Sequence, residues 1–327
     1  MNAVPDLSGN LSAEMRELML RVERELGPQP DPTLLPPEEG RAQSERSNQR
    51  NNVNLPPLAQ ATDILVAANA ELGSPACRMR VLVPHDAGAG AVLFVHGGGF
   101  AFCSPETHER CARVLANEIR LPVLVPDYRL APEHPFPAGL RDVVACLRAA
   151  FAATAEAGVS AGPLVIAGDS AGANLALAAV MHEERARHSP PSGMLLFYGA
   201  FGADFSTESY ERFAEGPGLT RGKMQRYWNW YCADEDTRRN PFAAPLHADD
   251  NVLRALPPLY LMAAGVDPLL SDTLLFAERL KAVGRNDPLT VVPGVTHGFL
   301  QNTNELAAAR EALTAAGEAA RGMIRGS

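Results

Sequence analysis

The alternation of short apolar runs with helical stretches, from about residue 78 onward, constrains the fold of this chain most strongly. The apolar runs are rich in Val, Leu and Ile and are bounded by Gly or Pro, which is typical of buried strands. They are Met79–Val83, Ala91–Val95, Pro122–Val125, Leu164–Ala167, Met194–Tyr198, Leu259–Ala263 and Leu289–Val292. The stretches with helical periodicity are Thr107–Ile119, Leu140–Thr154, Ala171–Arg185, Asp272–Val283 and Asn304–Ala320. This order predicts an α/β fold with a mostly parallel sheet that helices cover on both faces.

Two parts of the chain depart from this alternation. Before it, Leu11–Leu26 carries apolar residues at helical spacing, with Ser12 as N-cap and Gly27 as a stop signal. The prolines that follow exclude a continuous helix, and residues 43–54 could form a second, weaker helix. The first two strands of the alternation are close enough in sequence to form a hairpin, which would make the sheet mixed at one edge.

About sixty residues separate the strand that ends at Tyr198 from the strand that starts at Leu259, which is too many for a simple crossover. Ten of the 20 aromatic residues of the chain lie between Phe197 and Tyr231. They could form a small satellite core beneath an inserted pair of helices, or they could line a hydrophobic acyl or aryl pocket. Both interpretations can hold at once.

The amino-acid composition argues against several classes of function. With 29 Lys and Arg against 38 Asp and Glu, the net charge of −9 argues against nucleic acid or an anionic membrane as the main partner. The five cysteines form no C-x-x-C pair and are typical of reduced thiols in the cytoplasm. No apolar run approaches the roughly 18 residues of a membrane span, and the start of the chain lacks the features of a signal peptide. We therefore expect a soluble cytoplasmic protein.

The segment Gly168–Gly172 (GDSAG) follows one predicted strand and opens the next predicted helix. A serine on so sharp a turn needs flanking glycines, because a Cβ there would collide with neighbouring backbone. The turn would expose the Ser170 hydroxyl and direct a helix N-terminus toward developing negative charge. The alternative is a glycine-rich loop with an incidental serine.

The segment His96–Phe100 (HGGGF) directly follows another predicted strand. Successive glycines let a loop turn its amides toward a substrate oxygen, and the amide of Ala171 would complete such an oxyanion hole. Loops of this kind also bind phosphates, but the sequence contains neither G-x-x-x-x-G-K-[ST] nor G-x-G-x-x-G with a downstream acid. We expect His96 to shape the loop through a hydrogen bond rather than to act as a base.

A nucleophilic serine needs a base and an acid that orients it, and α/β-hydrolases place them in the order Ser, acid, His. Asp267 follows a predicted strand 97 residues after Ser170, and His297 follows the next predicted strand 30 residues later. His297 alone among the eight histidines occupies such a loop near the C-terminus. Asp272 is an alternative acid, although we expect it to cap the helix that follows.

Together HGGGF, GDSAG, DPL at 267–269, HGF at 297–299 and DYRLAPEHPFP at 127–137 resemble the hormone-sensitive-lipase-like esterases, the bacterial lipolytic family IV. The resemblance spans residues 78 to 302. It implies an α/β-hydrolase fold with a helical cap, built from an N-terminal segment (1–60) and an inserted segment (201–240). The catalytic domain would then comprise residues 61–200 and 241–327.

The same resemblance implies site residues. Ser170 would be the nucleophile, His297 the base and Asp267 the acid. Gly97, Gly98 and Ala171 would donate to the oxyanion. We also expect Phe100, Tyr198 and Phe201 to line the substrate pocket.

The expected function is a serine carboxylesterase that hydrolyses short-chain acyl esters, from acetyl to about hexanoyl, through an acyl-enzyme. The GDSAG form of the motif resembles that of relatives that favour short chains. The partner would be a small-molecule ester, the resemblance suggests a homodimer, and neither a metal nor an organic cofactor is needed. Hydrolysis of a lactone, amide or carbamate stays open, as does a non-catalytic small-molecule binder. Arg129 and Glu133 are expected to form an ion pair or brace a loop.

Overall fold

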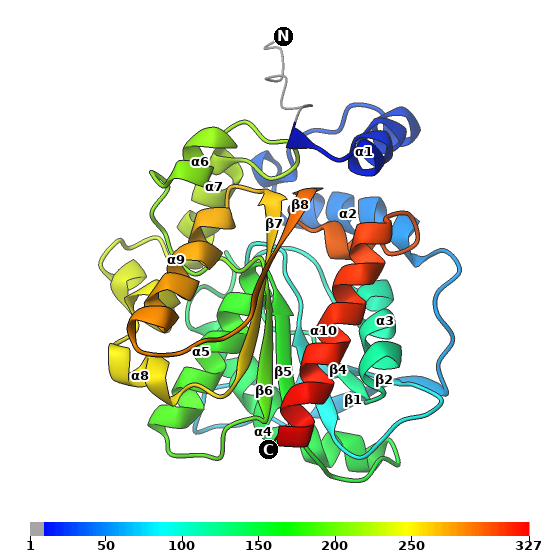
Figure 1. Cartoon of the computed structure of the whole chain (residues 1–327), viewed down its shortest axis with the longest axis vertical. Helices are drawn as coiled ribbons and strands as arrows, with labels where there is room; N and C mark the ends of the chain where they lie inside the picture. Colours follow the sequence, from blue (N-terminus) through cyan, green and yellow to red (C-terminus); the bar gives the residue numbers. More distant parts are fainter. Residues whose placement is uncertain (1–9, 327) are drawn as a thin grey trace.

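The computed structural model describes residues 10–326, and in this range eight strands form one sheet in the order β1-β2-β4-β3-β5-β6-β7-β8 (Figure 1). The strands are β1 (Gln60–Val66), β2 (Cys77–Val83), β3 (Ala91–Val95), β4 (Val123–Pro126), β5 (Leu164–Asp169), β6 (Gly193–Phe197), β7 (Leu259–Val266) and β8 (Leu289–Thr296). The pairs β1–β2 and β2–β4 are antiparallel, and the other pairs of neighbouring strands in this sheet are parallel. The predicted mostly parallel sheet is therefore confirmed.

The predicted hairpin between the first two strands of the alternation is wrong. β2 pairs with β1 and β4, whereas β3 lies in the interior of the sheet between β4 and β5. β1 was not predicted because only Ile64 and Val66 of its seven residues are buried, so its apolar pattern is weak. The sheet is still mixed at one edge, because β2 runs antiparallel to both β1 and β4.

Helices cover both faces of the sheet. α4 (Ala138–Glu156), α5 (Ala171–Arg185) and α9 (Leu270–Ala282) pack on one face, and α3 (Glu109–Ile119) and α10 (Ala307–Gly326) pack on the other. Alternate residues of β3 enter the two cores, with Leu93 in the first and Phe94 in the second. Each large apolar side chain buried in this way contributes about 1.5–3 kcal/mol. The cores hold the carboxyl ends of the parallel strands at one edge.

The N-terminal segment begins as expected. α1 (Ala13–Leu26) has Ser12 as N-cap, whose Oγ accepts from the Met15 amide at 3.1 Å, and Gly27 follows its end at φ 65°. α2 (Pro37–Asn48) starts six residues before the predicted helix, because a proline in the first turn needs no amide partner. A 3₁₀ turn, η3 (Gln49–Asn52), continues it.

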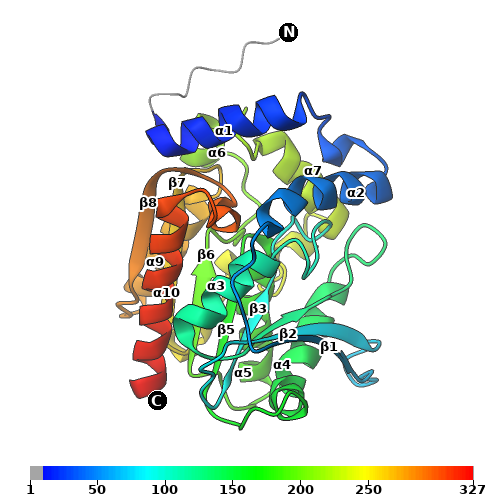
Figure 2. The same cartoon turned by 90° about the vertical axis from the view of Figure 1, so that its right-hand side faces the viewer.

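The inserted segment contains α6 (Glu208–Arg212) and α7 (Arg221–Tyr231), and α8 (Asp250–Ala255) follows. Figure 2 shows α1, α2, α6 and α7 gathered at the same end of the sheet. Arg226 of α7 joins the two segments, since its guanidinium donates to Thr33 Oγ1 at 2.6 Å and pairs with Asp31. The domain boundaries at residues 60, 200 and 240 stay a prediction.

Candidate active site

Ser170 occupies the turn between β5 and α5, with φ 55° and ψ −123°. Such a conformation strains a non-glycine residue by about 1–3 kcal/mol and is characteristic of functional sites. A Cβ at Gly168 would lie 2.5 Å from the Gly172 carbonyl oxygen, and a Cβ at Gly172 would lie 2.0 Å from that of Val95. The need for glycine on both sides of the serine is thus confirmed.

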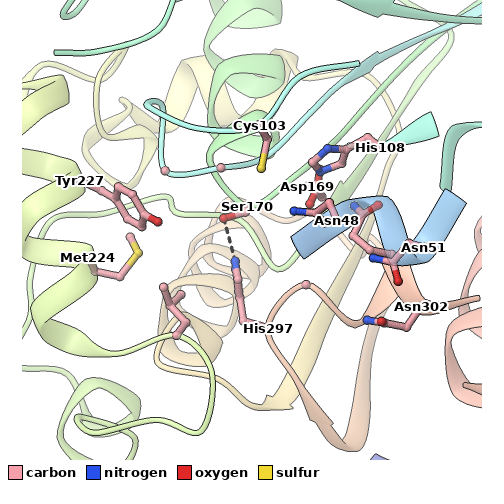
Figure 3. A pocket seen from close by; sticks show the side chains of 15 residues that line it. Asn48, Asn51, Cys103, His108, Asp169, Ser170, Met224, Tyr227, His297 and Asn302 are labelled. Carbon is pink, nitrogen blue, oxygen red and sulfur yellow. Dashed lines mark hydrogen bonds and ion pairs between the residues drawn. The ribbon is translucent and has the colours of Figure 1, made fainter. Parts of the chain in front are cut away.

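His297 and Asp267 meet Ser170 in one chain of hydrogen bonds. His297 Nε2 lies 2.8 Å from Ser170 Oγ (Figure 3), and His297 Nδ1 lies 2.7 Å from Asp267 Oδ2. The two residues follow β8 and β7, whose carboxyl ends lie at the same edge of the sheet as that of β5. Asp267 is completely buried, and its other oxygen accepts from the Leu269 amide at 2.9 Å. The fold therefore brings together three predicted site residues that lie far apart in the sequence.

The alternative acid, Asp272, has a different position. It lies inside the first turn of α9 instead of capping the helix, and Leu269 is the N-cap residue. Its Oδ2 accepts from the Gly202 amide at 2.9 Å, and burial raises the pKa of this carboxyl well above its usual range. The hydrogen bond to His297 belongs to Asp267.

In the HGGGF loop, the structure contradicts the prediction of Gly97 as an oxyanion donor. The Gly97 amide donates to Asp169 Oδ1 at 2.8 Å, so it is not available to a substrate. Gly98 and Gly99, at φ 118° and 59°, line the cavity in front of Ser170. Within residues 10–326 no hydrogen bond engages their amides. The Ala171 amide lies in the first turn of α5, where an amide has no partner within the helix.

Asp169 holds this loop in place. Burial alone would raise the pKa of its carboxyl, but His108, with Nε2 at 3.3 Å, and the Gly97 amide keep that pKa below its usual range. Tyr198 Oη lies 3.4 Å from the second carboxylate oxygen. This role was not predicted from the sequence, although the residue is the aspartate of the GDSAG motif itself.

His96 and Cys103 are other reactive types near Ser170. His96 Nδ1 lies 2.8 Å from the Gly97 carbonyl oxygen, and burial lowers the pKa of the ring to about 3, so it is neutral, as expected for a loop-shaping residue. Cys103 lines the cavity, but burial raises the pKa of its thiol to about 11. A thiol in this state is a poor nucleophile.

The predicted pocket residues Phe100, Tyr198 and Phe201 are wrong. Each is at most 2% exposed, and none of them lines the cavity. Phe100 stacks on Tyr231 with ring centroids 3.7 Å apart, and Phe201 packs on Phe276 at 4.9 Å. Tyr198 lies beneath the site, with its ring edge-on to that of His297 at 4.9 Å. Burial in the core therefore keeps all three side chains out of the cavity.

The cavity at Ser170 has a volume of about 220 Å³. Its lining side chains differ from one side to the other, as Figure 3 shows for Tyr227 and Met224 against Asn48, Asn51 and Asn302. Tyr227 comes from the aromatic-rich insertion, while Trp228 and Tyr210 of the same insertion are buried in the core that also contains α4 and α5. These two residues therefore belong to the main core rather than to a satellite core, and an acyl or aryl pocket stays a prediction.

Comparisons with known proteins agree with this geometry. A model of a family with the α/β-hydrolase fold matches residues 92–301. This chain belongs to the α/β-hydrolase family. Carboxylesterase NlhH of Mycobacterium tuberculosis is 36% identical to it over 225 residues, which are 68% of this chain and 70% of the relative.

Solved structures of other α/β-hydrolases match almost the whole chain. A hyperthermophilic esterase of the archaeon Pyrobaculum calidifontis has 31% identity and a TM-score of 0.86, with 96% of this chain and 98% of the other covered. A thermostable esterase of Pseudomonas putida has 25% identity and a TM-score of 0.88 over the same shares. The predicted membership of the hormone-sensitive-lipase-like esterases, a group of carboxylic ester hydrolases, is confirmed.

Two further residues of this hydrolase act as braces, but not on one another. Arg129 forms an ion pair with the buried Asp142 at 2.8 Å. Glu133 instead pairs with Arg41 of α2, whose guanidinium also donates to the carbonyl oxygens of Ala101 and Ala131 at 2.8 Å. Across residues 10–326, none of the helices combines the length and apolar character that a membrane crossing requires.

Proposed function

We propose that this hydrolase is a serine carboxylesterase that cleaves short-chain acyl esters, from acetyl to about hexanoyl, through an acyl-enzyme. The observation that carries the proposal is the continuous hydrogen-bond chain from Ser170 through His297 to Asp267 at the cavity. The relatives named above are carboxylesterases or esterases. Such a continuous set of hydrogen bonds also favours an enzyme over a non-catalytic binder.

In the first step, Ser170 Oγ attacks the ester carbonyl carbon while its proton passes to His297 Nε2. Asp267 holds the imidazole in the tautomer that can accept this proton. The carbonyl oxygen becomes an oxyanion, which we assign to the amides of Gly98, Gly99 and Ala171. Each such donor contributes about 3 kcal/mol in the transition state.

The intermediate then collapses as His297 gives its proton to the departing alcohol oxygen, which leaves the acyl group on Ser170. Water next attacks the acyl carbon while His297 takes its proton, and a second collapse releases the carboxylic acid and restores the serine hydroxyl. This sequence uses neither a metal nor an organic cofactor. A cavity of about 220 Å³ lies below the usual range of ligand pockets and favours a short acyl group.

The test is hydrolysis of p-nitrophenyl esters from acetyl to lauroyl by the wild type and Ser170→Ala. We expect kcat/KM to peak at short chains and to fall at least 10³-fold in Ser170→Ala, while Ser160→Ala, at an exposed serine, serves as the matched control. A Ser170-dependent peak at lauroyl would reject the chain-length assignment. Absence of Ser170-dependent turnover would reject the esterase.

A further inference from the structure

One side of the active-site cavity is formed by side-chain carboxamides. We call the set Asn48, Asn51, Gln301 and Asn302 the carboxamide wall. Two of its members come from the end of α2 and from η3, and two come from η6 (Phe299–Asn302), the turn that follows His297. Figure 3 shows Asn48, Asn51 and Asn302 on the opposite side of Ser170 from Tyr227 and Met224.

Two members of the wall are buried without their hydrogen-bond partners. Asn51 is 5% exposed and Gln301 is 7% exposed. Asn51 Oδ1 and both polar atoms of the Gln301 carboxamide bond to no other group in the described part of the chain. Nearly all buried polar groups in proteins are paired, and an unpaired one destabilises the fold by about 1–3 kcal/mol. Both side chains line the active-site cavity, so a ligand there can supply the missing partners.

The other two members are oriented by neighbours. Arg50 Nη1 donates to Asn302 Oδ1 at 3.1 Å, so the Asn302 amide hydrogens stay available. Asn48 Nδ2 donates to the Ser44 carbonyl oxygen at 2.9 Å, so Asn48 Oδ1 stays available as an acceptor. The wall therefore offers donors and acceptors side by side.

The wall carries no net charge. Its carboxamides are neutral. Of the ionisable side chains that also line the cavity, His108 and Asp169 are paired with one another at 3.3 Å, and His297 is paired with Asp267 at 2.7 Å. A charged substituent would lose its hydration here without gaining a counter-ion. A hydroxyl group can donate and accept at once and carries no charge, so it matches the wall.

We infer that the carboxamide wall binds a hydroxyl-bearing substituent of the ester, and hence that the substrates are short esters with a hydroxyl near the scissile bond. This inference rests on the proposed esterase function. The hydroxyl can belong to the alcohol or to the acyl part, and the experiment separates the two sources.

The test compares two pairs of esters of equal size in a pH-stat. The alcohol pair is 2-hydroxyethyl acetate against propyl acetate, and the acyl pair is ethyl 3-hydroxypropanoate against ethyl butanoate. We expect kcat/KM of the hydroxyl ester to exceed that of its methyl analogue at least tenfold in one pair, because a site built to bind a hydroxyl rejects the analogue that lacks it. The pair that shows this preference identifies the part of the ester that faces the wall. Ratios near or below one in both pairs would overturn the inference.

Gln301→Met and Asn51→Leu remove polarity with little change of volume. We expect each variant to lower the hydroxyl preference at least tenfold and to melt at the wild-type temperature or above, since an unpaired buried amide is lost. Gln49→Met, at an exposed carboxamide of the same 3₁₀ turn, is the matched control. An unchanged preference in a folded Gln301→Met would also overturn the inference. If either variant fails to fold, Asn48→Leu, at a half-buried position, replaces it.

Hydrolysis of p-nitrophenyl acetate by the wild type, checked against Ser170→Ala, separates the two proposals. Without Ser170-dependent turnover, the esterase assignment itself fails. With such turnover but without a hydroxyl preference, only the assignment of the wall fails.

Discussion

At the scale of single residues, the site depends on two buried carboxylates with different tasks. Asp267 accepts from His297 Nδ1 and from the Leu269 amide, which leaves the imidazole one orientation. Asp169 accepts from the Gly97 amide and lies beside His108, which holds the loop with Gly98 and Gly99 against β5. One carboxylate thus orients the imidazole of His297, and the other holds the HGGGF loop.

Asp267→Asn tests the first task. The amide is nearly isosteric, but it favours the imidazole tautomer that cannot accept the serine proton, so we expect kcat to fall by about 10³–10⁴. Steady-state kinetics with p-nitrophenyl acetate measure the loss of kcat, and circular dichroism checks the fold. Asp272→Asn is the matched control, and retention of more than a tenth of the activity by Asp267→Asn would contradict the assigned role.

Asp169→Asn tests the second task. Because charged partners form hydrogen bonds of about 1.5–3 kcal/mol, we expect a loss of stability of this order and a lower kcat. The pKa of Asp169 is depressed in the folded state, so its contribution to stability is complete above the ordinary value of about 3.9 and disappears as the pH falls through the lower folded pKa. Urea unfolding of both proteins from pH 7 to pH 3 measures this. A stability difference that vanishes already at pH 6 would rule out this role.

At the scale of elements, the connection from β5 to α5 is the tightest in the site. Gly172 brings the start of α5 against the end of β3, because its Cα faces the carbonyl oxygens of Val95 and His96. The helix can therefore start directly after Ser170, with the amide of Ala171 in its first turn. The close packing at Gly172 therefore fixes β5, the turn at Ser170 and α5 as one structural unit.

Gly172→Ala tests this unit. A Cβ 2.0 Å from the Val95 oxygen must displace backbone, which destabilises by about 1–3 kcal/mol or more and moves Ser170. We expect a lower melting temperature together with at least a hundredfold loss of kcat/KM. Gly322→Ala in α10 meets no atom within 4 Å and should stabilise by about 0.5–1 kcal/mol. Comparable melting temperatures for the two variants would refute the argument.

At the scale of the whole molecule, arginines connect the N-terminal segment to parts of the chain that lie far away in the sequence. Arg50 donates to Asn302, which lies 252 residues further along the chain, at 3.1 Å. It also donates to Glu305 at 2.7 Å. Arg41 reaches the loop that contains Ala131 and Glu133. The cavity therefore depends on the docking of a segment that lies far away in the sequence.

Arg50→Met tests this docking. Loss of two hydrogen bonds from a charged donor should destabilise by about 1–3 kcal/mol and loosen one side of the cavity. We expect KM for short esters to rise about threefold to tenfold with a smaller change in kcat. Steady-state kinetics measure the split, and Arg24→Met, at an exposed site on α1, is the matched control. An unchanged KM would show that docking and cavity are independent.

The sequence by itself determined the features that arise from local interactions. The periodicity of apolar residues gave the strands β2 to β8 and the main helices, because burial on a strand or helix follows its own repeat. Glycines on both sides of Ser170 indicated the sharp turn, and the order of Ser170, Asp267 and His297 indicated which loops meet.

Only the tertiary structure decided which groups face the substrate. The Gly97 amide is engaged by Asp169 and Phe100 turns into the core, although both residues belong to the HGGGF motif, and Phe201 is buried as well. The cavity is instead lined by side chains such as Asn51 and Gln301, which carry no motif of their own. The direction of a side chain and the occupancy of an amide depend on segments that pack together from distant parts of the chain, and local sequence does not encode that packing.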